Sequence, residues 1–314
     1  MKNFADRLID KIAAFNNPTV MGLDPKLEFI PQYLIDSCNK QTDNNQIASA
    51  MAIFEFNKML IDATYDIIPA IKPQFAYYEM YGIHGLETLY KTVSYAKSKG
   101  MIVIADAKRN DIGSTAEAYA AGILGSTTLS DSSSVSMLDA DAITVNAYLG
   151  IDGVEPFLKV AKDQGKGLFI LVRTSNPSAV DFQDLTLQDG RKLYEAVADK
   201  INSWGSDLVG DHGFSSIGAV VGATWPEQAQ DLRSRMPSAF VLVPGYGAQG
   251  GSADTAACSF SQDGTGAIVN ASRSLMCAYK KRSDLNETEF QIATRDEAIR
   301  MRDDLNAALM KKMK

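Results

Sequence analysis

Residues 101–112, MIVIADAKRNDI, begin with an apolar run and end in a cluster of charged residues. Apolar residues that follow one another without alternating with polar ones are typical of a parallel strand buried on both faces. The charged residues stand where this strand would end, and α/β barrels carry their functional groups at the C-terminal ends of their strands. The segment therefore predicts a buried parallel strand that leads into a functional site.

Seven further runs of the same kind lie before and after this segment. They are 19–24 (TVMGLD), 70–76 (AIKPQFA), 142–148 (AITVNAY), 167–174 (GLFILVRT), 217–224 (IGAVVGAT), 239–247 (AFVLVPGYG) and 266–274 (GAIVNASRS). Each ends in polar or charged residues, and longer stretches separate them. Eight such units at fairly even spacing favour a closed (β/α)8 TIM barrel, in the α/β class, over an open doubly wound sheet.

The stretches between these runs predict helices and surface loops. Residues 53–67 place Ile53, Phe56, Asn57, Leu60, Ile61 and Thr64 along one helical stripe, and residues 88–97 behave similarly. Three segments rich in Ser, Asn, Asp and Gly, near 36–46, 126–136 and 250–264, are expected to be surface insertions, and the Ser-rich second one is either a solvated loop or a lid. A barrel of roughly 250 residues with such insertions accounts for residues 1–314 as one domain.

The composition excludes some classes of binding partner and indicates the cellular compartment. The 314 residues are 46% hydrophobic and carry a net charge of −7, which argues against nucleic acid or a membrane surface as partner. Cys38, Cys258 and Cys277 are odd in number and widely spaced, so we expect reduced thiols. The opening MKNFADRLIDKI predicts an amphipathic helix rather than a signal peptide, and no run is long enough to span a membrane. A cytoplasmic protein is expected.

The charged end of the 101–108 strand is the strongest functional signal. Side chains alternate between the two faces of a strand, so Asp106 and Lys108 point together into the barrel mouth. Asp111 follows on the loop, and Lys72 can supply a second ammonium from its own strand end. Grouping these charges at one rim is costly unless they pair or serve chemistry, so both a structural ion-pair network and a catalytic array fit the pattern.

The segment 106–120, DAKRNDIGSTAEAYA, resembles the signature of the orotidine 5′-phosphate decarboxylase family in its longer, bacterial-type branch. Asn110 stands where many members have Gly. Further blocks match the family in its own order along nearly the whole chain. These blocks are GLDP (22–25), IKPQFAYYE (71–79), RTSNPSA (173–179), VGAT (221–224), PGYGAQGG (244–251) and NASRS (270–274).

The resemblance implies decarboxylation of orotidine 5′-monophosphate to UMP and CO2 without a metal or cofactor. Loss of CO2 leaves a carbanion at C6 of the pyrimidine, and the Lys108 ammonium can stabilise that charge and protonate it. Asp106 would hold Lys108 protonated and face the substrate carboxylate. Lys72 would pair with Asp106 and reach a ribose hydroxyl. Asp24 would bind the ribose, although a helix cap before Pro25 is its alternative role.

Other residues are expected to bind the base and the phosphate. Ser175 would hydrogen-bond the pyrimidine, with a turn serine before Asn176 as the alternative. The loops after the last two strands form the usual phosphate site of this barrel. Glycine-rich backbone amides and an arginine fork suit such a site. The candidates there are Tyr246, Gln249, Ser272 and Arg273.

The resemblance also implies a homodimer, in which Asp111, Ile112 and Thr115 reach the neighbouring subunit's site. An ordinary helix-start role is the alternative for Thr115. Three other functions remain open from the residues: a Mg²⁺-dependent sugar-phosphate decarboxylase with the same D-x-K-x-x-D pattern, a Schiff-base aldolase using Lys108 or Lys72, and a non-catalytic phosphate-binding barrel. His84 and His212 show no metal-ligand spacing.

Overall fold

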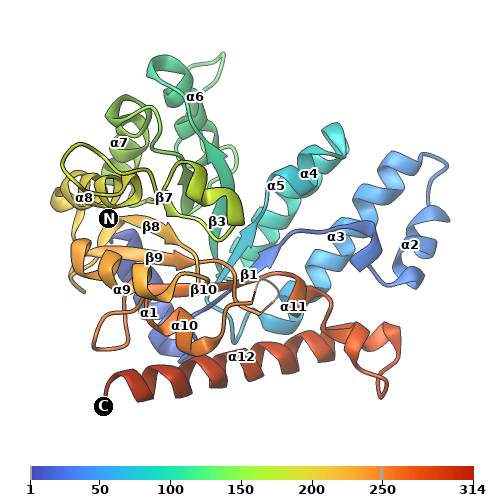
Figure 1. Cartoon of the computed structure of the whole chain (residues 1–314). Helices are drawn as coiled ribbons and strands as arrows, with labels where there is room; N and C mark the ends of the chain where they lie inside the picture. The colour runs from blue at the N-terminus through green and yellow to red at the C-terminus, as the bar shows by residue number, and fades with distance from the viewer. Residues whose placement is uncertain (1, 248–249) are drawn as a thin grey trace.

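The computed structural model describes residues 2–247 and 250–314, in which eight parallel strands close into a barrel (Figure 1). The strands follow one another around the barrel in the order β1-β10-β9-β8-β7-β6-β3-β2. They are β1 (Thr19–Leu23), β2 (Ala70–Pro73), β3 (Ile102–Arg109), β6 (Ala142–Val145), β7 (Gly167–Arg173), β8 (Ser215–Val221), β9 (Ala239–Val243) and β10 (Ala267–Ala271). The predicted TIM barrel and its eight strands are confirmed, although most strands end a few residues earlier than expected, because their polar ends turn into the loops.

Helices alternate with the strands, and most of them cover the outside of the barrel. They are α1 (Phe4–Phe15), α2 (Gln32–Asn39), α3 (Asn45–Thr64), α4 (Ala76–Glu79), α5 (Gly82–Ser98), α6 (Gly113–Ile123), α7 (Glu155–Gln164), α8 (Leu193–Trp204), α9 (Pro226–Arg235), α10 (Ala253–Ala257), α11 (Arg273–Met276) and α12 (Phe290–Lys312). Single 3₁₀ turns occupy Leu27–Phe29, Ile151–Gly153, Pro177–Asp181, Ser206–Leu208, Ala278–Lys281 and Glu287–Glu289. The six residues of the predicted stripe in α3 are all buried.

Two hydrophobic cores hold the barrel together. The larger one lies between the strands and the surrounding helices, and the smaller one fills the barrel interior. Helix α1 belongs to the interior core, because Phe4 and Leu8 pack with inward-facing strand residues such as Ile104. The Phe4 ring meets that of Phe169 edge-on at 5.8 Å between centroids. The amphipathic helix predicted at the N-terminus thus closes the end of the barrel opposite the charged strand ends.

The long helix α12, red in Figure 1, runs across the lower edge of the barrel and contacts α3, α10 and α11. Among the described residues, no helix combines the length and the apolar character needed to cross a membrane. Cys38, Cys258 and Cys277 are free thiols.

Regular structure occupies parts of the three segments expected to be surface loops. In 36–46, α2 continues to Asn39 and α3 begins at Asn45, and the Asn44 side chain caps α3 by accepting from two backbone N–H groups. The Ser-rich segment contains an antiparallel pair, β4 (Thr127–Thr128) with β5 (Ser134–Val135). Helix α10 lies in the third segment. Polar composition failed to identify these elements because Asn and Ser favour caps and turns as well as loops.

Candidate active site

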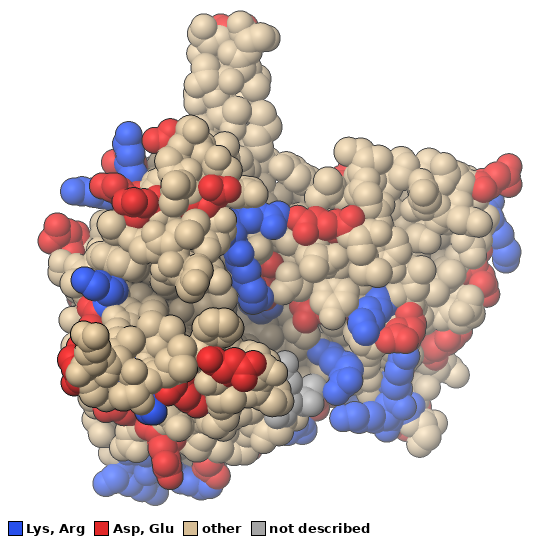
Figure 2. Space-filling view, turned by 45° about the horizontal axis from the view of Figure 1, so that its top comes forward, with Lys and Arg blue, Asp and Glu red and all other residues tan. Residues whose placement is uncertain are grey.

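A cavity of about 720 Å³ opens at the C-terminal ends of the strands, a size that suits a small ligand. In Figure 2, Lys and Arg side chains border the hollow in the middle of the face. Four cations line the cavity: Lys26, Lys72, Lys108 and Arg273. The cavity therefore offers local positive charge to an anionic ligand, although the whole chain carries a net charge of −7.

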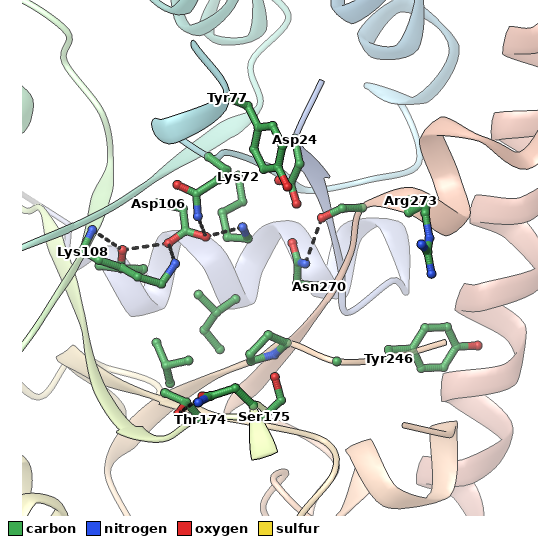
Figure 3. Close-up of a pocket in the computed structure, with 18 of the residues that line it drawn as sticks. Asp24, Lys72, Tyr77, Asp106, Lys108, Thr174, Ser175, Tyr246, Asn270 and Arg273 are labelled. Carbon is green, nitrogen blue, oxygen red and sulfur yellow. Dashed lines mark hydrogen bonds and ion pairs between the residues drawn. The ribbon is translucent and has the colours of Figure 1, made fainter. Parts of the chain in front are cut away.

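Two lysines converge on one carboxylate at the left of Figure 3. Lys72 Nζ lies 2.6 Å from Asp106 Oδ2, and Lys108 Nζ lies 2.5 Å from Asp106 Oδ1. The side chains of Lys72 and Asp106 are only 5% and 8% exposed, whereas that of Lys108 is 46% exposed. Lys108 is thus the ammonium of the pair that a ligand in the cavity can reach most freely.

Electrostatics keeps Asp106 and Lys72 each in one charge state around neutral pH. Burial by itself would raise the pKa of the Asp106 carboxyl, but the Lys72 and Lys108 ammoniums outweigh burial and hold that pKa well below its usual range. For Lys72 burial works toward a lower pKa, yet Asp106 and Asp24 raise it above the ordinary value. Asp106 is therefore ionised and Lys72 protonated.

The strand geometry explains how Lys108 reaches Asp106. Ile102 and Ile104 of β3 belong to the interior core, and Asp106, the next residue in this alternation, lines the cavity. Between Ala105 and Arg109 the pairing with β6 shifts register. Lys108 lies in this bulge with a φ of 47°, a left-handed conformation that costs a lysine energy. Bulges re-aim side chains in this way beside active sites.

Two neutral side chains complete the hydrogen bonding of Asp106, and neither was singled out from the sequence. Gln74 Nε2 donates to Asp106 Oδ2 at 3.1 Å. Thr144 Oγ1 donates to Asp106 Oδ1 at 2.9 Å and accepts the Lys108 backbone N–H at 3.0 Å. Thr144 could have been found from its position, since it stands two residues after the inward-facing Ala142 on β6. Together these bonds fix both oxygens of the carboxylate.

The middle of the cavity contains the residues predicted to bind the ribose and the base. Asp24 and Ser175 both line it, from opposite walls in Figure 3. Asp24 Oδ1 is buried without a hydrogen-bond partner among the described residues, so it can accept a hydrogen bond from a ligand. Tyr77 and Thr174 also line the cavity. Sequence reasoning missed both.

The far end of the cavity, opposite Lys108 in Figure 3, contains Arg273. The preceding residue, Ser272, also lines the cavity. Arg273 is exposed and forms no salt bridge with any described residue. Ser272 Oγ accepts a hydrogen bond from Asn270 Nδ2 at 3.3 Å. The neighbouring Gly22 leaves room for both side chains, because a Cβ there would lie 2.0 Å from Ser272 Oγ. Gln249 lies outside the described residues.

Tyr246 lines this end of the cavity with its ring, but its hydroxyl points toward α12. Tyr246 donates to Asp304 Oδ2 at 2.6 Å. Burial and the Asp304 carboxylate raise the pKa of Tyr246 to about 12. The observed hydrogen bond therefore fastens the loop after β9 to the C-terminal helix.

Asp111, Ile112 and Thr115 do not line the cavity of their own chain. The Asp111 carboxylate accepts the backbone N–H of Ile112 at 2.8 Å. Ile112 is exposed, and Thr115 is exposed on the first turn of α6. The described structure thus brings Lys72, Asp106 and Lys108 together and leaves the fourth predicted charge, Asp111, outside the array.

Comparisons with known proteins show the family of the chain. Residues 36–287 match the model of the Orotidine 5′-phosphate decarboxylase / HUMPS family. The chain is 41% identical to orotidine 5′-phosphate decarboxylase of Caldicellulosiruptor saccharolyticus, covering 98% of this chain and 100% of that one. It is also 41% identical to the Rhodopirellula baltica enzyme of the same name, over 97% and 99% of the two chains.

Solved structures give the same result. The Leishmania donovani OMP decarboxylase superposes with a TM-score of 0.73 at 29% identity, covering 98% of this chain and 99% of that one. UMP synthase of the same organism gives a TM-score of 0.74 at 30% identity, and the match covers 98% of this chain and 57% of that longer one. Both the sequence and the fold match these proteins, and the chain belongs to the orotidine 5′-phosphate decarboxylase family.

Proposed function

We propose that this protein decarboxylates orotidine 5′-monophosphate to UMP and CO2, with Lys108 as the proton donor. The observation that carries the proposal is the Lys72–Asp106–Lys108 array at one end of a cavity whose other end holds Arg273. The substrate carries two separate anionic groups, the carboxylate at C6 of the base and the 5′-phosphate on the ribose. The two cationic ends of the cavity match them.

The chemistry assigns one role to each member of the array. The bond between C6 and the carboxylate carbon breaks, CO2 leaves, and the electron pair stays at C6. The Lys108 ammonium stabilises this pair and then gives it a proton, and the resulting neutral amine regains a proton from water. Asp106 holds the Lys108 ammonium in position. Lys72, buried against Asp106, keeps that carboxylate ionised.

The phosphate end contributes through binding energy. A non-reacting phosphate held by Arg273 and by backbone amides of the glycine-rich loop can help to fix the base against Lys108. Asp24, Lys72 and Ser175 would orient the ribose and the pyrimidine in between. We include Tyr246, Gln249, and Ser272 among the phosphate-end residues, with Tyr246 acting through its ring or backbone because Asp304 engages its hydroxyl.

The charge pattern also bears on the Mg²⁺-dependent alternative. Asp106 is already paired with two ammoniums at 2.5–2.6 Å, and Gln74 and Thr144 use further lone pairs. A divalent cation at this carboxylate would meet two positive charges at close range. The arrangement therefore favours chemistry without a divalent cation at Asp106.

The proposal includes a cytoplasmic homodimer of single-domain subunits, in which Asp111, Ile112 and Thr115 reach the partner's site. Ile112 and Tyr148 are large apolar residues that are 52% and 80% exposed. They lie on neighbouring loops, since a Cβ at Gly153 would come within 3.0 Å of the Asp111 carbonyl oxygen. Exposed apolar side chains gathered beside a site are typical of a subunit interface.

The direct test follows the absorbance of orotidine 5′-monophosphate with purified protein in the presence of EDTA. Conversion to UMP under these conditions supports the proposed reaction and its independence of free divalent metal. The proposal would be overturned by a folded, dimeric protein that leaves orotidine 5′-monophosphate unchanged but acts on sugar phosphates when Mg²⁺ is added.

A further inference from the structure

Arg173, the last residue of β7, is the largest fully buried side chain among the described residues, with 0% exposure. It does not line the cavity. A buried guanidinium is costly unless its donors and charge are satisfied, and arginine cannot lose its charge at any ordinary pH. Its position directly before Thr174 and Ser175, which do line the cavity, calls for an explanation.

A strand irregularity turns Arg173 away from the barrel mouth. Phe169 belongs to the interior core and Leu171 packs against it, so regular alternation would send residue 173 inward as well. The pairing of β7 with β8 shifts register between Leu171 and Arg173. The side chain instead lies between aromatic rings, with its guanidinium carbon 4.1 Å from the Trp225 ring centroid and 5.4 Å from that of Tyr194.

Arg173 also forms hydrogen bonds with residues 183–184, which lie further along the chain after β7. Its Nη2 donates to Asp184 Oδ2 at 3.1 Å, and its Nη1 donates to Gln183 Oε1 at 3.4 Å. The guanidinium therefore joins two chain segments, 183–184 and Trp225, beneath the turn that carries Ser175. A planar fork that can stack and hydrogen-bond at once is a property of arginine that lysine lacks.

The two segments that Arg173 joins form hydrogen bonds with every polar group of Thr174. Gln183 Oε1 accepts the Thr174 backbone N–H at 3.0 Å, and Gln183 Nε2 donates to Thr174 Oγ1 at 2.8 Å. Trp225 Nε1 donates to the Thr174 carbonyl oxygen at 2.9 Å. On the other side, Gly222 allows the turn to pack closely, since a Cβ there would lie 2.9 Å from Ser175 Cβ.

From these contacts we infer that Arg173, Gln183 and Trp225 form a clamp that sets the position of the 174–175 turn and thereby the affinity of the site for the pyrimidine base. This inference rests on the proposed function, which assigns Ser175 to the base. Arg173 and Trp225 lie outside the cavity lining and are positioning residues, whereas Gln183 holds Thr174 and also lines the cavity. Thr174 in turn fixes the backbone from which Ser175 meets the ligand. The phosphate end of the cavity, at Arg273, is held by other strands and loops.

The clamp predicts a selective loss of affinity for the base. Trp225→Phe keeps a ring against Arg173 but removes the donor to Thr174, and Gln183→Ala removes both side-chain bonds to Thr174. Matched controls are Trp204→Phe, at the end of α8, and Gln188→Ala, exposed in the same loop as Gln183. Calorimetry would measure the dissociation constants of UMP and of ribose 5-phosphate for each variant.

We expect both clamp variants to bind UMP about 5- to 10-fold more weakly, the effect of losing one or two hydrogen bonds. Their affinity for ribose 5-phosphate should change less than about twofold, and both controls should match the wild type. Unchanged UMP affinity in the folded variants, or equal weakening of both ligands, would overturn the clamp. A lower melting temperature without a change in this selectivity would indicate a purely structural role and would overturn it as well.

The same experiment separates the clamp from the proposed reaction. Binding is measured without turnover, so the selectivity between UMP and ribose 5-phosphate reports on the clamp alone. A wild type that fails to convert orotidine 5′-monophosphate contradicts the proposed function. A wild type that converts it, with clamp variants of unchanged selectivity, contradicts only the clamp.

Discussion

Lys108 and Asp106 stand two residues apart on β3, and Lys108 Nζ reaches to 2.5 Å from Asp106 Oδ1 in a bulge where Lys108 adopts a φ of 47°. The strained conformation directs an ammonium that remains 46% exposed toward a carboxylate that is only 8% exposed. Backbone strain of this kind persists where the surrounding structure over-determines it. Here Thr144 and Gln74 fix the carboxylate, and Thr144 also holds the Lys108 backbone.

Lys108→Ala should lower kcat by at least about 10³-fold, because it removes both the proton donor and the charge beside the carbanion. Stability should change little, since the side chain is half exposed and alanine meets the same left-handed backbone cost as lysine. Steady-state kinetics and a urea melt measure the two effects. Lys159→Ala, exposed on α7, serves as the control. Substantial residual turnover would show that Lys108 is not the proton donor.

Asp106→Asn should destabilise the protein by about 3–5 kcal/mol near pH 7, because it leaves the buried Lys72 ammonium without its partner. The pKa of Asp106 is lowered in the folded state, so its ionised form stabilises the fold above the ordinary carboxyl pKa of about 4. That contribution is lost as the pH falls through the lowered folded pKa. The difference in the free energy of unfolding between Asp106→Asn and the wild type should therefore become smaller in acid.

Urea denaturation at a series of pH values between neutrality and the acid limit of folding measures this gap. Asp163→Asn, exposed on α7, is the matched carboxylate control and should show almost no gap at any pH. A gap for Asp106→Asn that stays constant or widens in acid would contradict the assigned pKa direction.

Co-expression of Lys108→Ala and Asp111→Ala chains tests whether Asp111 serves the partner's site. Each variant alone should be nearly inactive. A mixed dimer contains one site with both residues intact, so random pairing should restore about a quarter of wild-type activity. Turnover and the oligomeric state would be measured on the purified mixture. Activity that merely equals the sum of the two separate variants would show that Asp111 does not act across an interface.

Gly22→Ala should lower stability by about 1–3 kcal/mol through overpacking. The new Cβ would lie 2.0 Å from Ser272 Oγ and 2.8 Å from Asn270 Oδ1, on the neighbouring β10 side of the cavity. Displacement of Ser272 should also raise the dissociation constant for inorganic phosphate. Gly122→Ala in α6 is the control, because a Cβ there meets nothing within 4 Å and alanine favours helix. Thermal melts measure stability, and titration with inorganic phosphate measures its affinity. The packing argument would be refuted if Gly22→Ala and Gly122→Ala gave the same results.

The sequence by itself determined the barrel and the location of its chemistry. Unbroken apolar runs identified every barrel strand, because burial on both faces leaves a signal that is local in the chain. Alternation along 101–108 placed Asp106 and Lys108 on the inward side, since a strand reverses its side chains at each residue. The strand-end position supplied Lys72, and the resemblance supplied the roles of Asp24 and Ser175. The structure brings all three to the same cavity.

Only the tertiary structure decided the contacts that depend on how strands pair. Gln74 and Thr144 meet Asp106 because of the register among β2, β3 and β6. Arg173 does not point into the barrel, because the pairing of β7 with β8 shifts register there. Lys108 adopts its left-handed backbone conformation where the pairing of β3 with β6 shifts register. A register shift follows from the packing of neighbouring strands rather than from either strand alone, so local alternation predicts side-chain direction only up to the first bulge.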